Sequence, residues 1–278
     1  MGDGHRKRNP LPALTATTKP CSFTSFPRPL DSGSPFVFQR LGRGIIGRGE
    51  VCRAEFSGPN RFDEAQEWWA ELCANAVIND SVRRPGSGVV AFGTFTFASH
   101  SSQKSVLIVP ETILGIDESG AFETTIGPAP NTSINPGSTS LPSAESSALS
   151  GWTAGAIDAE RFLSLVGQVK SKIRSGSLQK AVIARDLTRK IGPEFSVSKV
   201  LTRLTEAYPD TFVFSIDGTI GASPETLASV RGRTVSLRVL AGSAPRGLNS
   251  VADTSQARKL AMSQKDLDEH QFAVQNVS

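Results

Sequence analysis

The sequence predicts a mixed α/β fold of the α+β kind, and three patterns favour that class. Apolar residues recur at three- and four-residue steps over residues 63–77, as in a helix with one buried face. Runs rich in β-branched and aromatic residues follow at 88–97 and 105–109, bounded by Pro, Gly and Ser, as in strands. Beyond residue 151, helical and extended patterns alternate. At 278 residues the chain is long enough to bury a large core.

Composition divides the chain into parts. Residues 1–59 are rich in Pro, Gly, Ser and Arg and have only short apolar runs, so we expect a flexible basic lead-in there. Residues 60–278 are expected to form the folded domain. Within that domain, residues 127–151 are dominated by Pro, Asn, Ser, Thr, Gly and Ala, which predicts a long low-complexity surface loop.

The elements of the domain follow from these patterns in chain order. The helix over 63–77 is expected to cover a sheet, and the two runs after it are expected to pair as antiparallel strands. Phe92, Phe95 and Phe97 are expected in the core. A base-stacking surface is the alternative, but it would require interleaved Lys or Arg, which this run lacks. The second half predicts helices at 158–175 and 197–207, strands at 180–187, 211–216, 226–230 and 234–240, and a closing helix from an N-cap at Thr254 through Asp266 and Glu269.

Charge and cysteine content exclude several classes of protein. Lys and Arg number 30 against 26 Asp and Glu, a net charge of +4 that is too small to require a nucleic-acid partner. Cys21, Cys52 and Cys73 are odd in number and widely spaced, so neither a disulfide framework nor a zinc site is expected. No apolar run is long enough to span a bilayer. We expect a cytoplasmic monomer that binds a small molecule, no nucleic acid and no membrane; a transit peptide is the competing explanation of the Arg-containing start.

Two titratable residues lie where general acid–base chemistry could use them. Lys180 begins an apolar run, where desolvation would favour the neutral amine of a base; a strand-edge lysine that keeps its charge in water is the alternative. Glu225 follows Ser223 and Pro224, and the proline stiffens a turn that could hold a partly buried acid. An ordinary exposed turn glutamate is the alternative there.

A third segment, Leu240 to Ser243, ends a predicted strand at a glycine. The exposed backbone amides of Ala241 and Gly242, with the Ser243 hydroxyl, could hold a substrate carboxylate. Ordinary turn formation explains the same residues equally well.

A fourth segment lies on the closing helix. Asp266 and Glu269 are three residues apart, and His270 is four residues after Asp266, so the three share one helix face that could offer oxygen ligands to a hard cation. Mg²⁺ is the ion that fits, because it needs few protein carboxylates and keeps water ligands. A solvated charged face is the alternative, and no His or Cys cluster favours a transition metal.

The blocks that contain these residues resemble four signature blocks of the chorismate-utilising enzymes, in order and in spacing. They read KAVIAR at 180–185, GASPE at 221–225, LAGSAPRG at 240–247 and SQKDLDEH at 263–270. Together they are most similar to those of isochorismate synthases. The resemblance is strong from residue 151 to the end and weaker over 62–110. It implies two packed, mainly antiparallel sheets with helices outside and an active site in a cleft at their edge.

The resemblance also implies a role for each matched residue. Lys180 would be the base that activates water for attack at C2 of chorismate, and Glu225 the acid that protonates the departing C4 hydroxyl. The enzyme would be an Mg²⁺-dependent isomerase, in menaquinone or siderophore synthesis. The substrate wall would be formed by Ala241, Gly242 and Ser243, and one metal ligand would be Glu269.

Several alternatives remain within and outside the family. Lys180 equally matches salicylate synthases, which add a pyruvate elimination. The ammonia-using anthranilate synthases lack a lysine at the matching position. Ala241 departs from aminodeoxychorismate synthases, which carry Lys there, and Val239 replaces a usual Pro. The family domain continues past the Glu-His block, whereas this chain ends at Ser278. We therefore expect a catalytic domain that is incomplete at its C-terminus. The alternative outside the enzymes is a truncated, catalytically dead product.

Overall fold

The computed structural model describes residues 11–26, 36–129, 151–192, 195–238 and 242–275. The chain divides into two compact units. The first unit comprises residues 1–136 and 198–278, and the second unit comprises residues 137–197.

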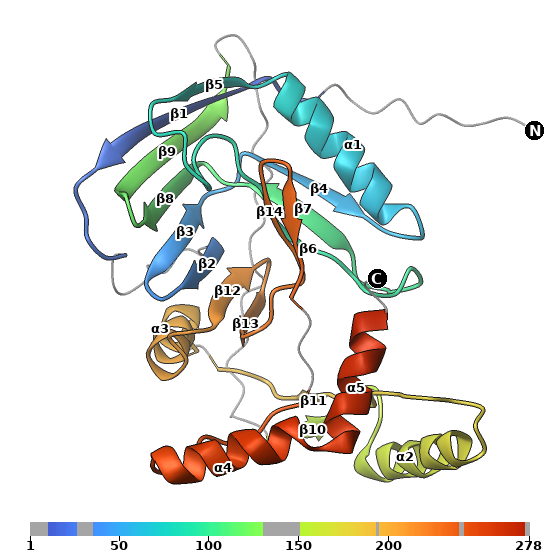
Figure 1. The fold of residues 1–278 in the computed structure, drawn as a ribbon. Helices are drawn as coiled ribbons and strands as arrows, with labels where there is room; N and C mark the ends of the chain where they lie inside the picture. Colours follow the sequence, from blue (N-terminus) through green and yellow to red (C-terminus); the bar gives the residue numbers. More distant parts are fainter. Residues whose placement is uncertain (1–10, 27–35, 130–150, 193–194, 239–241, 276–278) are drawn as a thin grey trace, which may run out of the picture. The chain divides into compact units, whose positions relative to one another are not determined.

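The first unit is built on an eight-stranded sheet with the strand order β13-β12-β2-β3-β8-β9-β1-β5 (Figure 1). All neighbours pair antiparallel except β1 and β5, which pair parallel. The strands are β1 (Leu14–Cys21), β2 (Phe36–Arg40), β3 (Arg43–Arg48), β5 (Val77–Asp80), β8 (Thr112–Asp117), β9 (Gly120–Pro128), β12 (Phe212–Ile216) and β13 (Thr219–Ser223).

A second sheet has the antiparallel order β4-β7-β6, with β4 (Cys52–Phe56), β7 (Ser105–Val109) and β6 (Phe92–Thr94). The predicted pairing of two runs here is confirmed. Phe92 is buried as predicted, but Phe95 and Phe97 are 43% and 100% exposed, so their prediction as core residues is wrong. The alternation of inward and outward side chains holds only while the strand continues, and β6 ends at Thr94.

The two sheets pack against each other through apolar side chains that come from both halves of the chain. Phe36 of β2 stacks on Phe92 of β6 with ring centroids 5.5 Å apart, and Ile216 of β12 joins the same buried cluster with Val106 and Ile108 of β7. Burial of apolar surface between facing sheets is the main stabilising term of such a fold. The predicted architecture of two packed, mainly antiparallel sheets is confirmed.

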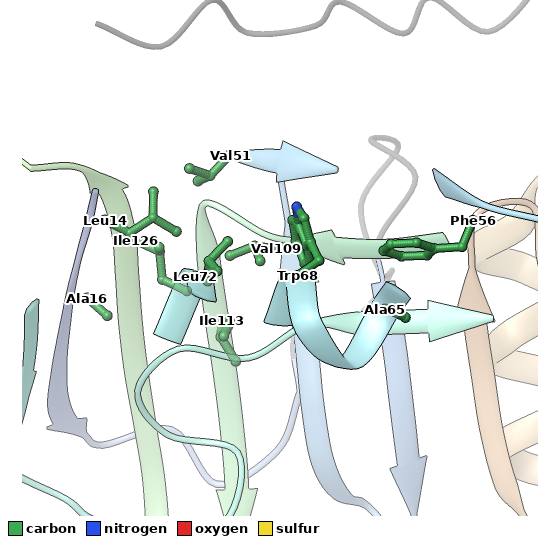
Figure 2. Packing of buried hydrophobic residues seen from close by; sticks show 10 residues of the cluster. All are labelled: Leu14, Ala16, Val51, Phe56, Ala65, Trp68, Leu72, Val109, Ile113 and Ile126. Carbon is green, nitrogen blue, oxygen red and sulfur yellow. The ribbon is translucent and has the colours of Figure 1, made fainter. Parts of the chain in front are cut away.

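Helix α1 (Arg61–Ala74) closes a larger buried cluster, as predicted for this segment. Ala65, Trp68 and Leu72 recur at helical steps and are buried, whereas Phe62 lies at the surface and stacks on Phe95. Figure 2 shows the three helix residues among side chains from the two sheets and from Val51, which lies in the bend before β4. Those partners are Leu14, Ala16, Val51, Phe56, Val109, Ile113 and Ile126.

The prediction of a flexible lead-in over residues 1–59 is wrong for the part that the structure describes. β1 to β4 all lie there, and Leu14 and Ala16 are fully buried. These strands are short, and their partners lie far along the chain: Leu14 of β1 faces Pro128 of β9. Strand stability comes from such neighbours more than from local composition, so the Pro- and Gly-rich composition misled the prediction. Most of the predicted loop at 127–151 lies outside the described residues.

The second half of the first unit contains α3 (Val197–Ala207), whose bounds are those predicted. It also contains a short antiparallel hairpin of β14 (Ser229–Arg231) and β15 (Thr234–Ser236). The single closing helix is instead two helices, α4 (Ser250–Ala261) and α5 (Gln264–Gln275). Asn249, not Thr254, caps α4: its side chain accepts from the amide of Ala252 at 2.9 Å, whereas the Thr254 hydroxyl donates within the helix to Ser250.

The second unit contains α2 (Ala159–Arg174), β10 (Thr153–Ala154) and β11 (Leu187–Thr188). The helix is capped by Asp158, which accepts from the amide of Arg161 at 2.7 Å. The strand predicted over 180–187 is wrong except at its end, because β10 offers a partner of only two residues. Over the described ranges of both units, no helix is long and apolar enough to cross a membrane.

We predict that Leu72→Ala destabilises the first unit by about 2–5 kcal/mol, because it removes a fully buried side chain and leaves a cavity. Leu163→Ala is the matched control, since Leu163 is also on a helix but is 68% exposed and should change stability by less than about 0.5 kcal/mol. Urea denaturation followed by tryptophan fluorescence measures both. Equal losses in the two variants would contradict the assignment of the core.

We also predict that Cys52 resists alkylation. Burial raises the pKa of the Cys52 thiol from 9.0 to about 12, and Glu50 adds to the shift. Since the thiolate is the reactive form, Cys52 at pH 9 should react with iodoacetamide about a hundredfold more slowly in the folded chain than in guanidinium. Because the folded pKa is the higher one, the associated stability is present below pH 9 and fades as the pH rises toward 12. Peptide mapping showing equal rates in both states would exclude this burial.

Candidate active site

Glu225 stands immediately after β13, at the turn that leads toward β14. The Ser223 hydroxyl accepts from the amide of Glu225 at 3.2 Å and lies 3.3 Å from the Glu225 carbonyl, so it holds the backbone around Pro224. The Ser-Pro-Glu segment therefore bends the chain between β13 and β14, as predicted for its position between two strands. The side chain of Glu225 is exposed rather than partly buried. Pro224 cannot donate to a ladder, and β13 is an end strand of its sheet among the described residues (Figure 1), which fits the exposure of this segment.

An ion pair fixes the hairpin that carries this turn. β12 and β13 are joined at Asp217 and Gly218, both of which have left-handed backbone angles (φ 49° and 78°). Both oxygens of the Asp217 carboxylate accept from the guanidinium of Arg53 on β4, one of them at 3.2 Å. The hydrogen bond to Asp217 raises the pKa of Arg53 above its ordinary value, and Glu50 contributes to the same shift. The fixed cation–carboxylate pair ties the hairpin to the second sheet.

The structure brings the Leu-Ala-Gly block against the Glu-His block. Gly242 has φ 79°, a conformation that favours glycine, and a Cβ added there would lie 2.9 Å from the Cβ of Asp266 on α5. Ser243, next to it, is exposed. Ala241 lies outside the described residues. Two segments that the sequence predicted separately thus meet at Gly242.

Two of the carboxylates of α5, those of Asp266 and Glu269, lie on the less exposed face of that helix. Asp266, Glu269 and Phe272 are each half-buried at three-residue spacing, whereas His270 is exposed. Asp266 and Glu269 therefore share a face as predicted, one turn apart, and His270 lies to the side of it. Within the described ranges, no group of three or more His, Cys, Asp or Glu side chains gathers as a metal site. A pair of carboxylates is still the donor set that Mg²⁺ uses when water and substrate supply the other ligands.

Asp253, for which no sequence pattern indicates a role, holds the loop after Gly242. Both oxygens of its carboxylate accept from the guanidinium of Arg246, at 2.8 and 2.6 Å, and one also accepts from the amide of Gly247 at 2.9 Å. The amide of Gly247 is the largest cause, and Arg246 the next, of an Asp253 pKa below its ordinary value. A local sequence pattern gives no signal for this contact, because Arg246 lies in an irregular loop.

Lys180 belongs to the second unit, between α2 and β11, whereas Glu225, Gly242 and Glu269 belong to the first. Lys180 is exposed and lies outside any strand, so the expected position at the start of a buried strand is wrong. The chain before it turns at Gly176, which has φ 75°, with the hydroxyls of Ser175 and Ser177 both donating to the carbonyl of Lys172.

Comparison with known proteins gives several partial matches. Anthranilate synthase component 1 of Thermococcus kodakarensis is 33% identical over 118 residues, which are 41% of this chain and 27% of that protein. Isochorismate synthase MenF of Bacillus subtilis is 31% identical over 122 residues, 42% of this chain and 26% of that protein. The chain thus spans about a quarter of the length of these curated relatives.

A solved structure extends the likeness to the fold. A Bacillus anthracis protein, DhbC, provisionally assigned as a 2,3-dihydroxybenzoate-specific isochorismate synthase, superposes with a TM-score of 0.58 and 25% identity. The match covers 87% of this chain and 59% of that one. Residues 20–127 and 129–278 match the family described as chorismate binding enzyme. Since this match spans most of the sequence, the chain belongs to the chorismate binding enzyme family.

Proposed function

We propose that this protein is an isochorismate synthase, an isomerase that interconverts chorismate and isochorismate. The observation that carries the proposal is the contact of Gly242 with Asp266, because it joins the proposed substrate wall to the carboxylate face of α5 in a member of a chorismate-binding family. The likeness to isochorismate synthases of Bacillus subtilis and Bacillus anthracis supports the choice of reaction.

In the proposed reaction, Lys180 takes a proton from water as the water oxygen bonds to C2 of chorismate. The ring double bonds shift, the bond between C4 and its hydroxyl oxygen breaks, and Glu225 gives that oxygen a proton. One water enters and one leaves, so the reaction is an isomerisation. An exposed Glu225 on a stiff turn is accessible to substrate, and the fixed Ser223–Pro224 backbone limits where its carboxyl group can lie.

The substrate has two carboxylates, and the loop and α5 offer complementary ways to neutralise them. Backbone amides near Gly242 and Ser243 would donate to one carboxylate, as amides at glycine-containing turns do for anions. Glu269, with Asp266 one turn away, would hold Mg²⁺, which when bound would offset the charge of a substrate carboxylate.

A second candidate is an anthranilate-forming enzyme, because anthranilate synthase component 1 proteins of two archaeal species and one bacterial species are each 33% identical to part of this chain. Lys180 favours the water-using reaction over this one, on the resemblance described above. Salicylate formation and a catalytically inactive chain are the further alternatives. The product formed from chorismate separates all four.

We predict that the purified chain, given chorismate and Mg²⁺, forms isochorismate. It should form no salicylate, and no anthranilate when ammonium is added. Lys180→Ala should lower the rate about 10²–10⁴-fold, because general-base catalysis contributes about that much. Lys170→Ala, an exposed lysine of α2 in the same unit, should leave the rate unchanged. Chromatography identifies the product. Lys180→Ala at full rate would overturn the base assignment, and anthranilate as the product would favour the second candidate.

A separate prediction concerns the cation. Glu269→Gln should weaken Mg²⁺ binding at least about tenfold, since even indirect partners of a metal site contribute on that order. Asp268→Asn is the matched control: Asp268 is on the exposed side of the same helix and accepts from Gln264 at 2.7 Å. Isothermal titration calorimetry with MgCl₂ and chorismate measures the dissociation constants without relying on turnover. Equal weakening in the two variants would contradict a ligand role for Glu269.

A further inference from the structure

Asp253 combines an ion pair with a main-chain hydrogen bond. It lies in the first turn of α4, and its carboxylate receives the Arg246 guanidinium on both oxygens and the Gly247 amide on one. The Arg246 side chain is 89% exposed, and an exposed ion pair alone would contribute little to stability. The hydrogen bond from the Gly247 amide differs from the ion pair, because it fixes the main chain of the loop rather than two flexible side chains.

The loop also packs directly on the first turn of α4. A Cβ added at Gly247 would collide with the backbone nitrogen of Asp253, so the loop's main chain lies against the helix where only glycine fits. Asn249 caps the same turn through Ala252, and the Asn249 carbonyl accepts from the amide of Asp253 at 2.9 Å. The end of the loop and the start of α4 therefore form one hydrogen-bonded unit.

The other end of the loop contacts α5 at Gly242. Four residues separate Gly242 from Gly247, and a chain that short has little freedom once one end is held. Gly242 needs its left-handed backbone to approach Asp266 closely. The loop is thus held at α4 through Asp253 and lies against α5 through Gly242; Figure 1 shows the two helices consecutive and adjoining.

We propose that Asp253 is a positioning residue: it fixes the loop of residues 242–249 so that the amides near Gly242 lie beside the carboxylate face of α5. Asp253 does not itself contact substrate in this account. It acts through Gly247 and Arg246, with the amide of Gly247 as the principal contact. The loop geometry stands on the structure alone, while the consequence for chorismate rests on the proposed function.

Hydrogen exchange of the intact chain, followed by mass spectrometry, tests the loop geometry without turnover. Asp253→Ala removes both contacts, whereas Arg246→Ala keeps the bond from the Gly247 amide. Exchange at Gly247 should rise at least about tenfold in Asp253→Ala and by less in Arg246→Ala. The amides of α1 should be unchanged in both variants. Unchanged exchange in Asp253→Ala, or equal exchange in the two variants, would overturn the role of the amide contact.

Binding and kinetics test the positioning role. Asp253→Ala should raise KM for chorismate about tenfold with a smaller change in kcat, as expected for lost binding rather than lost chemistry. Asp253→Glu, which keeps the charge, should recover part of the loss, and Asp268→Asn should behave as the parent. A fall in kcat with KM unchanged would overturn the positioning role. If the parent neither binds nor converts chorismate, the proposed function fails, while the exchange data still decide whether Asp253 fixes the loop.

Discussion

The pairing of β2 with β12 is the interaction on which the first unit and its proposed acid depend. It joins residues 37–39 to residues 213–215 across more than half of the chain, and the stacking of Phe38 on Phe212 supports it on one face. Because β12 is paired in turn with β13, this register sets where Ser223 ends the sheet and where Glu225 begins its turn. The N-terminal strands are therefore part of what positions the acid.

The proposed substrate wall depends on a different, more local arrangement. Gly242 meets α5 through glycine geometry, and Asp253 holds the same loop against α4 through hydrogen bonds. Gly242 permits the backbone conformation of the loop, and the hydrogen bonds of Asp253 limit its movement. Together they place backbone amides near carboxylates, a combination suited to an anionic substrate whose charge is shared between amide donors and a cation.

Local signals predicted some elements well and could not predict others. The helical patterns of α1 and α2 lie in adjacent residues, so both helices were predicted to within a few residues. β1 was missed because its antiparallel partner, β9, lies far along the chain. The site blocks were visible as motifs, but the approach of Gly242 to Asp266 depends on how α4 and α5 fold back, and no period or spacing encodes it. Residues 180–186 form no strand in the part of the chain that the structure describes, and the sequence around Lys180 does not indicate this.

Isotope incorporation tests the central claim most directly. Chorismate and Mg²⁺ are incubated with the chain in water enriched in ¹⁸O, and the product is analysed by mass spectrometry and NMR. Our account predicts isochorismate that carries one ¹⁸O atom, in the hydroxyl group at C2. A product without the label at C2 would contradict the claim that this chain adds water to chorismate. Chorismate recovered unchanged would contradict it too, provided that an active isochorismate synthase converts chorismate under the same conditions.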